Sequence, residues 1–68
     1  MTPIMKLLLN YIKDNIDEND QIKMSNSELS LKLGVHVMSI SRCVKLLKQE
    51  NIIETKYEDN LRRVITLL

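Results

Sequence analysis

The only glycine of this 68-residue chain, Gly34, separates two segments with helical periodicity. The segment before it opens with SNSE, in which Ser25 and Glu28 have the spacing of a capping box. Leu29 and Leu33 then lie one helical turn apart. Glycine adopts the left-handed backbone that ends many helices without the penalty of a Cβ. The sequence therefore predicts a helix that begins near Ser25 and stops at Gly34, with another helix directly after the turn.

The helix after the glycine, predicted over about residues 37–51, has two faces of different chemistry. Ile40, Val44 and Leu47 follow the i, i+4, i+7 spacing of a buried stripe, and Cys43 beside them is expected to be a small core residue. The opposite side carries Val37, Met38, Ser41, Arg42, Lys45 and Lys48. One face is thus expected to pack a core, which leaves the other face for a partner.

The flanking segments complete a small α+β fold with the order helix-strand-helix-helix-strand-strand. A first helix is predicted up to the polar run DENDQ at 17–21, because Thr2 can cap it, Pro3 suits its first position, and apolar residues recur every four positions. Residues 22–24 alternate like a short strand. Residues 52–57 and 61–68 predict a β-hairpin around a polar turn at 58–60. Residues 1–68 are expected to form one domain.

Composition argues against several classes of protein. One Cys cannot form an internal disulfide and is too few for a typical structural zinc site, so a reducing, cytoplasmic location is expected. The chain has no run of 18 apolar residues that would span a membrane, and its N-terminal segment lacks the cleavage site of a signal peptide. With one His, one Cys and no glycine-rich phosphate loop, we expect no enzyme, no cofactor, no metal and no small-molecule ligand.

The charge is unevenly distributed, although the net charge is only +1. Residues 1–31 contain three Lys and five Asp or Glu, which gives −2, whereas residues 32–68 contain seven Lys or Arg and four Asp or Glu, which gives +3. The C-terminal half is therefore the candidate half for binding an anionic partner.

The stretch SNSELSLKLGVHVMSISRCVKLLKQENIIETKYEDNLRRVITL, from Ser25 to Leu67, resembles the winged helix-turn-helix family of DNA-binding domains found in many bacterial and phage regulators. Three positions depart from the family pattern. Ser30 stands where Ala is usual, and His36 stands where Ser or Thr usually caps the recognition helix. Asn51 replaces the usual glycine after that helix and is the non-glycine residue type that best tolerates a left-handed backbone.

The resemblance implies that the start of the recognition helix enters the DNA major groove. It nominates His36, Val37, Met38, Ser39, Ser41, Arg42 and Lys45 as contacts. Arg42 can bond a guanine edge or clamp a phosphate, and the two serines suit phosphates. Two alternatives remain open: that His36 serves solely to cap the helix, and that Lys45 is a solvated helix residue without a partner.

The hairpin corresponds to the wing of the family, which touches the DNA backbone or the neighbouring minor groove. It adds Lys56, Asn60, Arg62 and Arg63 as candidate contacts. Arg62 and Arg63 are adjacent in a strand, so they must point to opposite faces, and the sequence leaves open which one faces DNA.

Three functions remain open. The first is sequence-specific binding of double-stranded DNA by a transcriptional regulator, most simply a repressor. The second is an origin-binding module of a plasmid or phage replication or partition protein, and the third is a protein-interaction module with the same fold. A homodimer through the first helix is also expected, because Leu7 and Tyr11 fall off its core line, unless they merely cover the edge of the small core.

Overall fold

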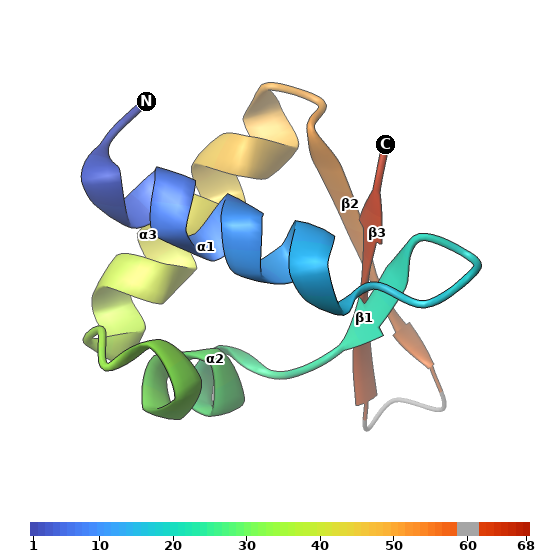
Figure 1. Cartoon of the computed structure of the whole chain (residues 1–68), viewed down its shortest axis with the longest axis horizontal. Coiled ribbons are helices and arrows are strands. Elements are labelled where there is room, and N and C mark those ends of the chain that lie inside the picture. Colours follow the sequence, from blue (N-terminus) through green and yellow to red (C-terminus); the bar gives the residue numbers. More distant parts are fainter. Residues whose placement is uncertain (59–61) are drawn as a thin grey trace.

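The computed structural model describes residues 1–58 and 62–68, and in these residues the chain forms three helices and three strands in the predicted order. The helices are α1 (Pro3–Asn15), α2 (Asn26–Leu33) and α3 (Val37–Gln49), and the strands are β1 (Gln21–Lys23), β2 (Ile53–Glu58) and β3 (Arg62–Leu67). The helices gather to one side of the sheet, with α1 running across α3 (Figure 1). The α+β class and the order of elements are thus confirmed.

The helix ends follow the local signals of the sequence. The Thr2 hydroxyl accepts a hydrogen bond from the Met5 N–H at 3.2 Å and caps α1. Ser25 and Glu28 form both hydrogen bonds of the capping box at the start of α2. Gly34 ends α2 in the left-handed conformation, with φ of +64°. These caps satisfy backbone groups that have no partner inside a helix.

The third helix is shorter than the sequence predicts. It ends at Gln49 instead of Asn51, and the N–H of Glu50 donates to the Leu46 carbonyl. Asn51 then takes a left-handed conformation with φ of +59°, as expected for the residue that replaces glycine there. The chain leaves the helix axis at this residue, and β2 consequently begins at Ile53.

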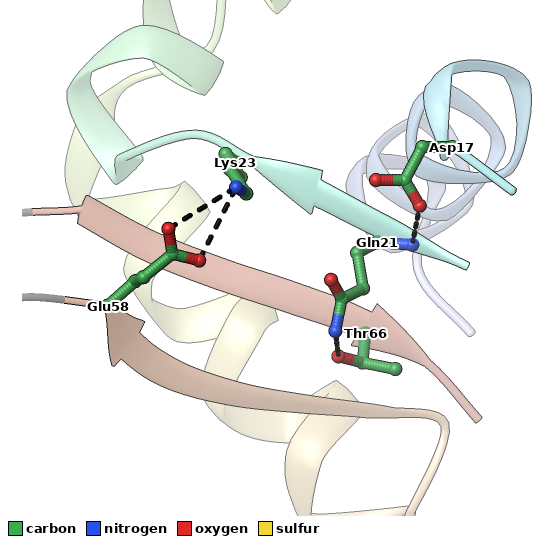
Figure 2. Close-up of polar contacts among 5 residues, drawn as sticks. All are labelled: Asp17, Gln21, Lys23, Glu58 and Thr66. Atoms are coloured by element: carbon green, nitrogen blue, oxygen red, sulfur yellow. Dashed lines mark hydrogen bonds and ion pairs between the residues drawn. The ribbon is translucent and has the colours of Figure 1, made fainter. Parts of the chain in front are cut away.

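The three strands form an antiparallel sheet with the order β1-β3-β2, so that β3 is central. Across β3, Lys23 Nζ of β1 lies 3.3 Å from Glu58 Oε2 of β2 (Figure 2). Val64, the register partner of Lys23 and Lys56, is almost fully buried, even though it lies on the face away from the helices. At the other end of β1, the Asp17 carboxylate accepts the Gln21 N–H at 3.1 Å and holds the turn before the strand (Figure 2).

The core lies between the helices and the inner face of the sheet, the face turned toward α3. The predicted stripe of Ile40, Val44 and Leu47 is buried, and Cys43 is buried beside it, so both expectations are confirmed. The remaining buried members of this core come from α1, α2 and all three strands: Met5, Leu8, Ile12, Ile22, Leu29, Ile53 and Ile65. In residues 1–58 and 62–68, none of the helices has the length and apolarity that crossing a membrane requires.

Candidate nucleic-acid interface

The outward side of α3 presents the side chains that the sequence assigns to it. Ser41, Arg42, Lys45 and Lys48 are exposed, and so is Met38, with 62% of its surface accessible. Val37 is exposed as well, whereas Ser39 is half-buried. Residues 37–49 contain no Asp or Glu, so no carboxylate of the helix itself offsets these three cationic side chains. The buried stripe fixes the helix by one side and leaves this cationic side to solvent.

The turn that leads into α3 is held by two side chains. The Ser30 hydroxyl donates to the Val35 carbonyl at 2.6 Å, which ties the end of α2 to the turn. His36 caps α3, because its Nδ1 accepts the Met38 N–H at 3.1 Å. A nitrogen that accepts a hydrogen bond carries no proton, so the neutral ring with its proton on Nε2 is the form that caps the helix. His36 remains exposed and therefore caps α3 while facing solvent.

A hollow of about 390 Å³ lies between α3 and the β2–β3 hairpin, and we call it the α3–hairpin groove. It is lined by Asn26, Ser41, Val44, Lys45, Lys48, Gln49, Thr55, Tyr57 and Arg63. Two lysines of α3 and one arginine of β3 thus share the groove with a phenol, two amides and two hydroxyls. Such a lining suits an anionic, hydrogen-bonding partner.

A larger hollow, of about 640 Å³, lies where the start of α1 meets the end of α3. It is lined by Met1, Thr2, Met5, Leu46, Glu50 and Ile52. It contains no Lys or Arg side chain, and its one charged side chain is a carboxylate. The α3–hairpin groove is therefore the better candidate for nucleic acid.

The strand register separates the candidate contacts of the hairpin. Tyr57 pairs with Arg63, whereas Lys56 pairs with Val64 and Glu58 pairs with Arg62. Because side chains alternate along a strand, Tyr57 and Arg63 share the inner face, and Lys56 and Arg62 lie on the outer face, away from α3. The two arginines therefore point to opposite faces, as the sequence requires. Asn60, also a candidate contact, lies outside the described residues.

Arg63 is the inner arginine, and its guanidinium is engaged with other parts of the fold. Its Nε donates to the Met24 carbonyl at 3.0 Å, and its Nη1 donates to the Asn26 side-chain oxygen. Burial lowers the pKa of the Arg63 guanidinium, and the Tyr57 phenol and the Glu28 carboxylate oppose that shift. Arg62, by contrast, is exposed on the outer face.

Tyr57 is a groove residue that the sequence analysis did not nominate. Its side chain is 69% exposed and lines the α3–hairpin groove across from the lysines of α3. The signal was the alternation that starts at Ile53, since Ile53, Thr55 and Tyr57 must share one face of a strand. In the two strands of the hairpin only cationic residues were nominated, and an uncharged tyrosine was therefore missed.

Within the described part of the chain, no three His, Cys, Asp or Glu side chains come close enough together to hold a metal ion. A protein-family model described as Firmicute plasmid replication protein (RepL) matches residues 4–62, which include α2, α3, β1, β2 and all of α1 except Pro3. No curated protein matches the chain, and no solved structure matches it.

Proposed function

Because the chain belongs to the RepL family of Firmicute plasmid replication proteins, we propose that it binds double-stranded plasmid DNA at the site where replication starts. In this proposal α3 enters the major groove and the β2–β3 hairpin lies against the adjoining backbone. The family favours the origin-binding alternative over a transcriptional repressor. The protein acts by binding rather than by catalysis, in the cytoplasm where plasmid DNA is found.

The observation that carries the proposal is the division of α3 into two sides. Ile40 and Leu47 are fully buried, while Ser41, Arg42 and Lys45 between them are exposed. The major groove of B-DNA is about 12 Å wide and admits a helix of this size. A helix held by its buried stripe can present these side chains to base edges without rearranging the core.

The roles on α3 follow from the chemistry of each side chain. Arg42 has the planar fork that bonds guanine O6 and N7 or clamps a phosphate. Ser39 and Ser41 suit phosphates, and Val37 and Met38 suit thymine methyls. The exposed face of His36 at the start of α3 completes the set that enters the groove. Lys45 and Lys48 line the α3–hairpin groove and supply cations for the DNA backbone.

Binding is expected to depend strongly on salt. Arg42, Lys45 and Lys48 could neutralise three phosphates, and each neutralised phosphate contributes about −0.9 to the slope of log affinity against log salt. A slope of roughly −2.7 is therefore expected from α3 alone. On the outer face, Lys56 and Arg62 can add to this only if DNA also reaches that side of the hairpin.

A homodimer through α1 is part of the proposal, because one small domain offers few contacts. Leu7 is 44% exposed on α1, whereas Tyr11 is partly buried against the core. Leu7 is thus the residue of this pair that is most available to a second copy. We expect Leu7→Asp to abolish dimers in sedimentation equilibrium while the helical content stays unchanged, and an unchanged mass would contradict this interface.

The test of the function is selection of duplexes from a random pool, followed by sequencing of the bound fraction. We expect an enriched sequence for the wild type, its loss in Arg42→Ala, and its retention in Lys13→Ala. Lys13 is a matched control because it is an exposed cation of α1 that does not line the α3–hairpin groove. Absence of binding even at low salt would refute the proposal.

The position of the enriched sequence separates the two DNA functions. Its recurrence within the replication region of a plasmid that encodes this chain supports the replication role. Its placement over a promoter alone would favour the repressor instead.

A further inference from the structure

Arg63 connects the hairpin to the helix pair that carries α3. Its two hydrogen bonds reach Met24 and Asn26, which lie 39 and 37 residues away along the chain. Asn26 is the first residue of α2, and Met24 precedes the residue that caps it. One side chain thus joins β3 to the point where the chain enters the helix-turn-helix.

The guanidinium has little capacity left for a phosphate. Nε and one N–H of Nη1 are engaged, and Nη2 is buried, with no hydrogen-bond partner among residues 1–58 and 62–68. A nitrogen that water cannot reach is not available to DNA unless the side chain moves. Arg62, its neighbour, shows the opposite arrangement, because it is exposed and points to the outer face.

Arg63 lies near the end of the hairpin that the core does not anchor, so its hydrogen bonds act on that end. The inner face of the sheet is anchored to the core by Ile53 and Ile65, which are almost completely buried. Arg63 is the inner-face residue of β3 that precedes Ile65, at the end of the hairpin where Tyr57 and Glu58 are exposed. Its hydrogen bonds attach this less covered end to α2.

Tyr57 is the strand partner of Arg63 and lies on the same face. Both residues line the α3–hairpin groove, but only Tyr57 is largely exposed. Given the proposed function, on which this inference rests, we propose that Arg63 is a positioning residue. It fixes the hairpin against the start of α2 so that Tyr57, rather than Arg63, contacts DNA opposite Lys45 and Lys48.

The experiment measures the affinity of each variant for the selected duplex by fluorescence anisotropy over a range of salt concentrations. The variants are Arg63→Gln, Arg63→Lys and Tyr57→Ala. The control is Lys13→Gln, at an exposed cation of α1 that does not line the α3–hairpin groove. Circular dichroism confirms for each that the protein is folded under the binding conditions. We expect Arg63→Gln and Arg63→Lys each to weaken binding about tenfold. Neither glutamine nor lysine can reproduce the forked pair of hydrogen bonds, even though lysine keeps the positive charge.

The salt dependence separates positioning from contact. Loss of a positioning residue leaves the slope of log affinity against log salt unchanged. Loss of a phosphate contact reduces its magnitude by about 0.9, and lysine at that position would restore most of the binding. A reduced slope in Arg63→Gln therefore overturns the proposal, and so does unchanged affinity in the folded variant, which would mean a structural role only.

A double variant tests whether Arg63 acts through Tyr57. In the Tyr57→Ala background, Arg63→Gln should have almost no further effect, since coupled residues do not give additive losses. A second full loss would show that Arg63 acts independently.

If Arg63→Gln does not fold, Asn26→Ala removes one acceptor and no charge, and about a threefold loss with an unchanged slope is expected. Failure of the proposed function can be told apart from failure of this inference, because in the first case the wild-type protein itself would not bind the duplex.

Discussion

The Ser30 hydroxyl donates a 2.6 Å hydrogen bond to the Val35 carbonyl and so spans the turn between α2 and α3. We expect Ser30→Ala to lower the free energy of unfolding by about 1 kcal/mol, because alanine fills the same space but leaves the half-buried carbonyl without this donor. Urea unfolding followed by circular dichroism measures the change. Ser27→Ala, at an exposed position of the same helix, is the control and should have little effect. Equal stability of the two variants would mean that the hydrogen bond contributes nothing.

Position 34 favours glycine because of its left-handed backbone conformation, and not because a larger side chain would collide with its neighbours. A Cβ built at this position meets no atom within 4 Å, but the φ of +64° is unfavourable for residues that carry one. Gly34→Ala is therefore expected to cost about 1–2 kcal/mol, and Gly34→Asn less, because asparagine tolerates this region best. Thermal unfolding of the two variants checks the order. An alanine variant as stable as the wild type would contradict the backbone explanation.

His36 is an imperfect cap that a better residue type can replace. Its Nδ1 accepts the Met38 N–H, and asparagine at this position would supply the oxygen acceptor preferred there. We expect His36→Asn to be more stable than His36→Ala by about 1 kcal/mol. The comparison uses melting temperatures of both variants. Since the side chain is exposed, lost packing does not complicate the result, and equal melting temperatures would exclude a capping role.

Cys43 is expected to make the protein less stable at alkaline pH. Burial raises the pKa of its thiol above the ordinary value of 9.0, and the positive charge of Arg42 opposes part of that shift. The folded state therefore holds the thiol proton more tightly than the unfolded state does. This contribution to stability is complete below the unfolded pKa and is lost as pH rises through the folded value.

The corresponding measurement is the free energy of unfolding of wild type and Cys43→Ala as a function of pH. Other groups titrate in both proteins, so the difference between the two isolates the thiol. We expect the wild type to lose stability relative to the variant as pH rises above 9.0. A constant difference across that range would show that the thiol has the same pKa in both states.

The ion pair across the sheet is expected to contribute little. Lys23 and Glu58 are 41% and 53% exposed, and exposed pairs are screened and cost side-chain entropy. A double-mutant cycle with Lys23→Met and Glu58→Gln should give a coupling of about 0.5 kcal/mol or less, decreasing with salt. Denaturation at low and high salt provides the values. A coupling above about 1 kcal/mol would mean that the pair is shielded from solvent in solution.

Local signals were sufficient to predict the helices and their order. The capping box at Ser25, the proline at the start of α1 and the glycine at position 34 each act within a few residues, and so does the spacing of the buried stripe. The short first strand was predicted one residue late, at 22–24 instead of Gln21–Lys23. Its limits depend on pairing with β3, where Gln21 meets Thr66, and no local pattern encodes a contact across that separation.

The candidate site was less predictable, because its contacts also join residues that lie far apart in the sequence. Alternation required that Arg62 and Arg63 point to opposite faces, but the hydrogen bonds of Arg63 to Met24 and Asn26 assign it to the inner one. Ser30 could be recognised only as a small residue, because its bond to Val35 depends on how α2 meets α3. The choice between replication and transcription is not encoded in the fold, since one fold serves many functions. The family match is what favours replication.

The central position of β3 imposes an order on how the protein is made. β1 and β2 each pair with β3 and not with one another, so both remain without a sheet partner until the ribosome has synthesised residues 62–67. The contacts between α2 and α3 are short in sequence and are expected to form earlier than contacts between distant residues, such as that of Gln21 with Thr66. We therefore expect the α2–α3 pair to form before the sheet, and the groove beside α3 is complete only when β3 has inserted between β1 and β2.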